Sequence, residues 1–192
     1  MNTPVHLLLG AAALAKGGER RLIWAALVGA LLPDLSLYLL AASALYVLNI
    51  PAQIVFDQLY FSQLWQTVFA VDNSFVVWAI LLGLAIWQRL DWAIVLTGAA
   101  ILHLVLDLPL HHDDGRPHFW PITSWIFESP LSYWDRSRGA EWIAPIGAAA
   151  AAICAVILLR RRPGVLLSSL ILGLLLAELM VARVWMFVFS GT

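Results

Sequence analysis

A histidine and an aspartate inside a strongly apolar segment have the spacing of a functional site. His103 and Asp107 lie four residues apart in the stretch 92–110, so on a helix both side chains project from one face, about 6 Å apart. Both are costly to bury in hydrocarbon unless they are paired, hydrated or bound to a metal. Together they can ligate one ion, or the carboxylate can orient the imidazole. The alternative is a hydrogen bond within the helix that serves structure alone.

Ionisable side chains also occur in three other apolar segments. They are His6, Asp34, Glu178 and Arg183. At about 1.5 Å of helix per residue, all of them except Arg183 come to roughly 15–24 Å from the expected cytoplasmic end of their segment, as do His103 and Asp107. Asp34 follows Pro33, which interrupts helical hydrogen bonding and can turn the carboxylate into a helix bundle. We therefore expect several helices to bring these groups into one layer, and we assign no role to Arg183.

A second dense group of possible ligands follows directly. Between 111 and 118 the sequence contains three histidines and two aspartates, namely His111, His112, Asp113, Asp114 and His118. Such side chains suit zinc, manganese or iron. His111 is four residues beyond Asp107, so the helix face that carries the first pair can continue to it. The alternative is a solvated loop at the membrane surface. Asp72 is expected near the same outer face, beside Asn73, which would cap the next helix.

The composition indicates what must position these groups. Hydrophobic residues make up 62% of the 192 residues and charged residues only 12%, and the mean hydropathy is +0.86. Soluble domains are about half apolar and about a quarter charged, so most of this apolar surface must face lipid or other helices. The ten tryptophans suit the membrane interface. With a net charge of −1 and scattered basic residues, we expect no nucleic-acid partner.

We therefore predict a single integral membrane domain over 1–192, a polytopic all-α transmembrane bundle with about six spans. The expected spans are 4–15, 22–48, 75–87, 92–110, 141–159 and 165–189. The first is short, about 18 Å of helix, and is expected to be retained instead of cleaved as a signal peptide. The mixed stretch 51–71 is predicted to be an amphipathic helix along the interface, and 111–139 a polar loop.

The basic residues predict an orientation. With six spans, seven lysines and arginines fall in loops on one side, and three arginines fall on the other side, all of them in the loop 111–139. The positive-inside rule places the first group in the cytoplasm. Both termini and the loop 111–139 are then expected on the periplasmic side, and the layer of ionisable groups in the outer half of the bilayer.

Three short blocks in the first 121 residues resemble a known family. The blocks are Thr3-Pro4-Val5-His6-Leu7-Leu8, Gly29-Ala30-Leu31-Leu32-Pro33-Asp34, and His103-x-x-x-Asp107 ahead of Trp120-Pro121. They resemble the bacterial inner-membrane proteins described as YdjM-type metal-dependent hydrolases. Members usually carry an H-R-G-x-T-H-S motif at the entry to the third span, where this sequence reads Val71-Asp72-Asn73-Ser74-Phe75. Two interpretations follow: His111, His112 or His118 substitutes for the missing ligands, or the chain is a degenerate relative of the family.

Together, the residues and the resemblance predict a membrane-embedded metal-dependent hydrolase. One divalent ion, with zinc as the first choice, would be held by His6, Asp34, His103 and Asp107. Asp107 and His111 would be catalytic, and His111 or Asp72 would support the site. The substrate would be an amphiphilic ester or phosphoester, such as a lipid headgroup.

Two other functions fit the same sequence. The chain could be a non-catalytic accessory or assembly subunit of a larger bacterial membrane complex, with the small residues 148–152 and the aromatic stretch 51–69 as contact surfaces. A transporter or proton relay ranks third, because the sequence has no inverted repeat and its ligand-like residues gather on one side of the membrane.

Overall fold

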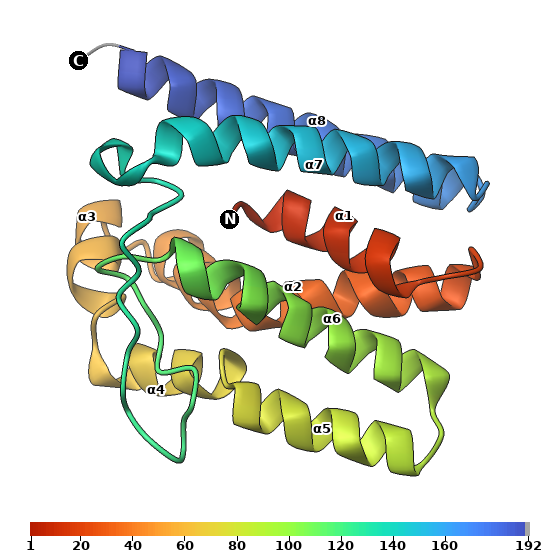
Figure 1. The fold of residues 1–192 in the computed structure, drawn as a ribbon. Helices are drawn as coiled ribbons and strands as arrows, with labels where there is room; N and C mark the ends of the chain where they lie inside the picture. Colours follow the sequence, from red (N-terminus) through yellow and green to blue (C-terminus); the bar gives the residue numbers. More distant parts are fainter. Residues whose placement is uncertain (191–192) are drawn as a thin grey trace.

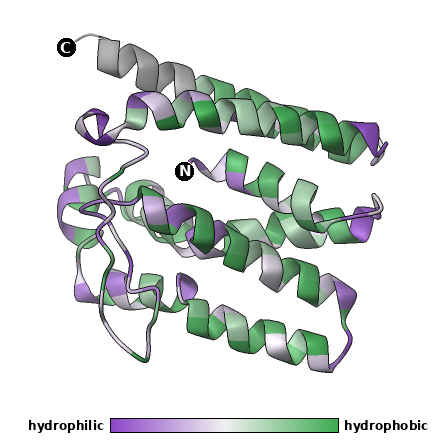
Figure 2. Cartoon of the chain, viewed as in Figure 1, coloured by the Kyte–Doolittle hydropathy of each residue, from purple (hydrophilic) through white to green (hydrophobic). Residues whose placement is uncertain are grey.

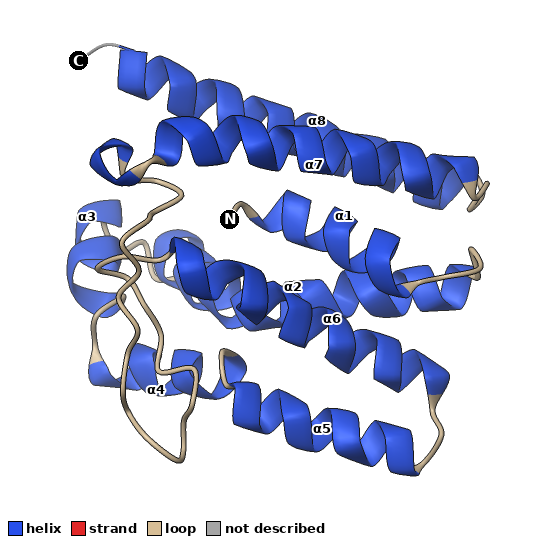
Figure 3. Cartoon of the chain, in the orientation of Figure 1, coloured by secondary structure: helices blue, strands red, loops and turns tan. Residues whose placement is uncertain are grey.

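The structure is a computed structural model that describes residues 1–190, with side chains described as far as Val181, so the Arg183 side chain lies outside the described part. Every regular element in residues 1–190 is helical (Figure 3). In chain order these are α1 (Thr3–Leu14), α2 (Arg20–Ala42), the π-helical turn η1 (Ser43–Val47), α3 (Ala52–Ile54), the π-helical turn η2 (Val55–Leu59), α4 (Gln63–Asp72), α5 (Phe75–Trp87), α6 (Asp91–Asp107), the 3-10 turns η3 (Leu108–Leu110) and η4 (Arg136–Arg138), α7 (Ala140–Arg160) and α8 (Val165–Ser190). The all-α prediction is confirmed.

Four helical segments within the described residues are long and apolar enough to cross a membrane. They are Arg20–Val47, Gln63–Trp87, Asp91–Leu110 and Ala140–Arg160. Two further apolar segments, Thr3–Leu14 and Val165–Val181, are shorter. The prediction of six spans is therefore too high by this measure. For α1 the reason is its length, because 12 residues give about 18 Å of helix against a hydrocarbon core of about 30 Å.

The helices are apolar along most of their length and polar near their ends (Figure 2). Large hydrophobic side chains are exposed midway along them, such as Ile80 at 59% and Ile153 at 62%. Trp87 ends α5 and Trp142 lies in the first turn of α7, and both are well exposed, as suits the membrane interface. An outer surface of this kind is stable against lipid and not against water, so the chain is a membrane protein.

The stretch 51–71 is not the single interfacial helix that we expected. It consists of α3, η2, a turn and most of α4. Trp65 and Phe69 of α4 are buried in one cluster with Ala44 and Val55, so the apolar face of α4 packs on protein instead of on the membrane surface. After Asp72 the chain runs on into α5, and the two helices together form the candidate span Gln63–Trp87.

The junction between α4 and α5 differs from the expectation in its cap. Ser74, not Asn73, is the N-cap of α5, because its hydroxyl accepts the Val77 N–H at 3.1 Å. Asn73 instead ends α4. Its side chain donates to the carbonyl oxygens of Phe69 and Pro33, at 3.0 and 3.2 Å, and so ties α4 to α2.

Helix α1 lies at the centre of the bundle, in contact with α2, α6, α7 and α8 (Figure 1). The carbonyls at the C-terminal end of a helix have no donors within that helix and need partners from elsewhere. The Arg161 guanidinium supplies them, at 3.5, 2.8 and 2.9 Å from the carbonyl oxygens of Ala11, Ala12 and Ala15. This anchoring keeps His6 inside the protein instead of in lipid.

Helices α2 and α6 pass each other with their backbones in contact. A Cβ atom added at Gly29 would lie only 2.0 Å from the carbonyl oxygen of Leu96, so only glycine fits there. The next residue of α2, Ala30, consequently lies against the part of α6 that carries His103.

The connections of the bundle gather at its two ends (Figure 1). The turns 15–19, 88–90 and 161–164 lie at one end. The seven lysines and arginines that are predicted to face the cytoplasm are found in or next to these turns. The loop 111–139 and the end of α8 lie at the other, whereas α1 starts inside the bundle, short of that end. The compartment that each end faces stays a prediction.

Candidate metal centre

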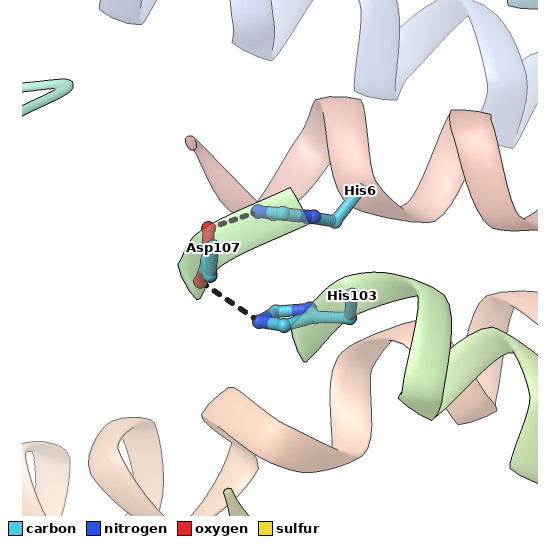
Figure 4. Close-up of side chains that lie close together, drawn as sticks. All are labelled: His6, His103 and Asp107. Atoms are coloured by element: carbon cyan, nitrogen blue, oxygen red, sulfur yellow. Dashed lines mark hydrogen bonds and ion pairs between the residues drawn. The ribbon is translucent and has the colours of Figure 1, made fainter. Parts of the chain in front are cut away.

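Three buried side chains from two helices meet inside the bundle. His6 comes from α1, and His103 and Asp107 come from α6 (Figure 4). His6 Nε2 lies 2.7 Å from Asp107 Oδ1, and His103 Nε2 lies 3.2 Å from Asp107 Oδ2. The two imidazole rings stack with their centroids 4.0 Å apart. One ligand atom from each residue lies within 4.8 Å of the others, so the group could hold one metal ion.

A backbone hydrogen bond sets the orientation of His103. Its Nδ1 lies 2.7 Å from the carbonyl oxygen of Ala30 in α2. A carbonyl oxygen can only accept, so Nδ1 carries the proton. Pro33 lacks an N–H and so leaves the carbonyl of Gly29, one residue before Ala30, without its helical donor. Metal-binding histidines usually donate their second ring nitrogen in this way.

The other ring nitrogen of His103 faces two carboxylates. Nε2 lies 3.2 Å from Asp107 Oδ2 and 3.6 Å from Asp34 Oδ1, is fully enclosed, and makes no hydrogen bond. In a neutral imidazole with its proton on Nδ1, Nε2 bears a lone pair. Buried lone pairs of a nitrogen and two carboxylates converge stably only around a cation. That cation is either a proton on His103 or a metal ion.

Asp34 lies beside the group of three, as the sequence predicts. The Thr3 hydroxyl donates to Asp34 Oδ2 at 2.6 Å, and Tyr38 in turn donates to the Thr3 hydroxyl oxygen at 2.6 Å. These contacts hold the carboxylate with its other oxygen towards His103. Asp34 is therefore placed to act as a further ligand or to orient the histidine.

Asp107 has two more nitrogen partners. The Met1 amino nitrogen lies 2.5 Å from Oδ1, and His111 Nε2 lies 3.3 Å from Oδ2. His111 Nδ1 is in turn 3.1 Å from Asp114 Oδ1, so its ring bridges two carboxylates. Burial lowers the pKa of His111, but Asp107 and Asp114 outweigh it and raise that pKa to about 9. Of the three loop histidines, His111 is the one that reaches Asp107.

A cavity of about 280 Å³ opens beside Asp107. The start of α1, the part of α2 that follows Pro33, and the loop after α6 enclose it. Its polar lining includes Asp34, Asp107, His111, Asp114, Tyr60 and Arg116. Tyr60 and Arg116 were not anticipated from the sequence. The only local signal was an arginine inside the histidine-rich stretch, and nothing near Tyr60 marks it.

The other candidate residues lie outside the group of three, although His118 also lines the cavity. Asp72 does not line this cavity, so the structure does not bring it to the site as a supporting residue. Glu178 is buried in α8 and accepts a hydrogen bond from Asn2 at 2.9 Å, apart from the group of three. His112 and His118 each use Nδ1 to contact a backbone carbonyl, at 2.7 and 2.8 Å, and so organise the loop.

No family model, no curated protein and no solved structure matches this chain. The resemblance to YdjM-type proteins therefore stays a prediction. All three sequence blocks that carry it contribute to one place in the fold, since the first supplies His6, the second Asp34, and the third His103 and Asp107.

Proposed function

We propose that this protein is a membrane-embedded hydrolase that depends on one divalent metal ion. His6, His103 and Asp107 would hold the ion, and Asp34 would be a fourth ligand or would orient His103. The substrate would be an ester or phosphoester of an amphiphilic molecule that enters the cavity beside Asp107.

The strongest support is the environment of His103 Nε2. A proton alone would leave a buried imidazolium stacked on His6, with the Asp107 oxygen outside hydrogen-bonding geometry. A metal ion would satisfy this nitrogen, and it would replace the contact that His6 Nε2 now makes to Asp107 Oδ1, while the Ala30 carbonyl already holds the required tautomer of His103. The donor set can therefore hold a metal ion, and His103 Nε2 is the atom that the present ion pairs leave without a hydrogen bond.

Zinc is the ion that we propose. Two imidazole nitrogens and one carboxylate oxygen, with an open position beside them, are typical of catalytic zinc sites. The same three donors also suit ferrous iron, so elemental analysis must distinguish the two. A bound divalent ion supplies Lewis acidity, which lowers the pKa of a coordinated water and polarises the bond to be cleaved.

Asp107 and His111 would carry out proton transfer during hydrolysis. His111 lines the cavity and contacts both Asp107 and Asp114, so it can pass a proton between the cavity and either carboxylate. In the overall reaction the water oxygen forms a bond to the acyl carbon or the phosphorus. The bond from that atom to the leaving oxygen breaks, and the leaving oxygen takes up the proton that His111 delivers.

We also propose that the protein lies in the bacterial inner membrane, with both termini and the loop 111–139 in the periplasm. The distribution of basic residues favours this orientation. The cavity would then open towards the outer leaflet, where amphiphilic substrates are available.

Hydrolysis of chromogenic probes tests the proposal. Purified protein in detergent, loaded with zinc, should release para-nitrophenol from para-nitrophenyl butyrate or para-nitrophenyl phosphate. Asp107→Asn and His111→Gln should lower the rate by at least about 100-fold, the effect of removing one general acid–base group. His112→Gln is the matched control, since its contact to Ser129 lies outside the site, and should keep the rate. Metal-loaded protein that cleaves neither probe would instead favour the accessory-subunit role.

A further inference from the structure

A buried arginine lines the cavity without a carboxylate partner. Arg116 is 9% exposed. Its guanidinium donates to the Tyr60 hydroxyl at 2.6 Å and to Gln66 Oε1 at 3.3 Å. It also lies over the Phe69 ring, 4.3 Å from the centroid. All these partners are neutral, and none of the ion pairs formed among the described residues includes Arg116.

The acidic residues of the cavity are engaged elsewhere. Asp34 accepts from Thr3, Asp107 meets His6 and the Met1 amine, and Asp114 meets His111. The cavity thus has two kinds of charged group in its lining. One is the cluster of carboxylates and histidines that suits a metal ion. The other is the Arg116 guanidinium, which is buried and forms no ion pair with the described residues.

An unmatched guanidinium in a cavity favours an anionic ligand. Arginine has five N–H donors in a planar fork, and Tyr60 and Gln66 occupy only part of this set. The fork matches the oxygens of a phosphoryl group, and such charge-assisted bonds are about twice as strong as neutral ones. The guanidinium also lies over the Phe69 ring, a contact that restricts its orientation. A carboxylic ester, which is neutral, would leave this charge unpaired.

The cavity also reaches the apolar surface of the bundle. Leu37 and Val181 lie in its wall, and Tyr38 lines it while remaining 48% exposed. A molecule with a phosphoryl headgroup in the cavity could therefore leave its apolar part along α2, towards lipid.

We propose that Arg116, supported by Tyr60, is a phosphoryl-binding residue, and that the substrate is a phosphoester of an amphiphile. This inference rests on the proposed hydrolase function and narrows its substrate class. Water adds to the phosphorus, the bond between phosphorus and the alcohol oxygen breaks, and the alcohol leaves with one proton. Arg116 binds the non-bridging oxygens throughout and takes no part in proton transfer.

Binding of three probes to the purified protein in detergent tests the subsite. Dihexanoyl phosphatidic acid and inorganic phosphate carry the phosphoryl group, and dihexanoylglycerol lacks it. Calorimetry should detect the first two and not the third. The phosphatidic acid should bind more tightly than phosphate, because its chains reach the apolar wall. Equal or weaker binding would point to free phosphate and overturn the amphiphile assignment.

Substitutions then assign the binding to Arg116. Arg116→Met should weaken phosphatidic acid binding by about tenfold or more, the effect of losing one charged hydrogen-bond donor. Arg116→Lys should fold with its charge intact and lose part of the affinity, because lysine lacks the fork. Arg138→Met is the matched control, since Arg138 pairs with Asp135 and does not line the cavity. Unchanged affinity in both Arg116 variants would overturn the proposal.

Metal content separates this inference from the proposed function. If the protein binds zinc but its affinity for phosphate does not depend on Arg116, the proposed phosphoryl subsite is wrong. A metal-dependent esterase would then remain the proposed function. If the protein holds no metal but binds phosphate through Arg116, the subsite stands and the hydrolase proposal fails.

Discussion

The contact between α2 and α6 should control both the stability of the bundle and the metal centre. An added Cβ at Gly29 would lie 2.0, 2.7 and 2.8 Å from three backbone atoms of Leu96, none of which can rotate away. Ordinary contacts begin near 3.4 Å, so Gly29→Ala must separate the helices by more than about 1 Å. The bond from His103 Nδ1 to the Ala30 carbonyl, 2.7 Å long, would then stretch beyond about 3.6 Å and be lost.

Two quantities should therefore fall in Gly29→Ala. The free energy of unfolding should drop by about 1–3 kcal/mol, the usual cost of overpacking. Zinc affinity should drop by about 10–100-fold, because His103 loses the hydrogen bond that fixes its tautomer and orientation. Tryptophan fluorescence in a denaturant titration in detergent measures the first, and competition with a chromophoric zinc chelator measures the second.

Gly83→Ala provides the matched control. Gly83 also lies within a helix, but nothing lies within 4 Å of the position that its Cβ would take. This substitution should leave zinc affinity unchanged and stabilise the protein by up to about 1 kcal/mol through helix propensity. If Gly29→Ala behaves like Gly83→Ala in both measurements, the close approach of α2 and α6 does not position His103.

Two further substitutions probe the supports of the site. Arg161→Leu should lower the free energy of unfolding by about 2–3 kcal/mol, because the carbonyls at the end of α1 lose a charged donor. Arg160→Leu, at an exposed position, should change the free energy of unfolding little. Denaturant titration measures both variants, and equal effects would contradict the anchoring role of Arg161. Asp34→Asn should keep the Thr3 contact and the fold but weaken zinc binding by about tenfold, and unchanged affinity would remove Asp34 from the ligand set.

Much of the fold follows from local features of the sequence. The apolar runs specify helices because only helices satisfy backbone groups in lipid, and the His103–Asp107 pair follows from helical spacing alone. The number of spans does not follow as directly. Helix α1 is too short to cross a bilayer, and it lies inside the bundle because other helices surround it and Arg161 caps its end. That anchor is 150 residues away from Ala11, so no local pattern reveals it.

The sequence predicted the candidate metal ligands, all of which lie on helices. It did not predict two residues of the cavity lining that lie in a loop and a turn. His6, Asp34, His103 and Asp107 occur at similar depths and converge, whereas Glu178, expected at a similar depth, contacts Asn2 instead. Asp72 was expected at the same outer face as the histidine-rich loop but does not line the cavity, because Ser74 caps α5 and Asn73 binds the Pro33 carbonyl. Arg116 and Tyr60 escaped prediction because their contact joins an irregular loop to the turn before α4, 56 positions apart.

The metal content of the purified protein tests the central claim most directly. Inductively coupled plasma mass spectrometry of protein extracted without chelators should find about one zinc ion per chain. His103→Ala and Asp107→Ala should each remove it, while His112→Ala, outside the site, should retain it. Wild-type protein without a stoichiometric metal, or a His103→Ala variant that keeps its full complement, would contradict the account and leave Asp107 as the centre of a buried ion-pair network.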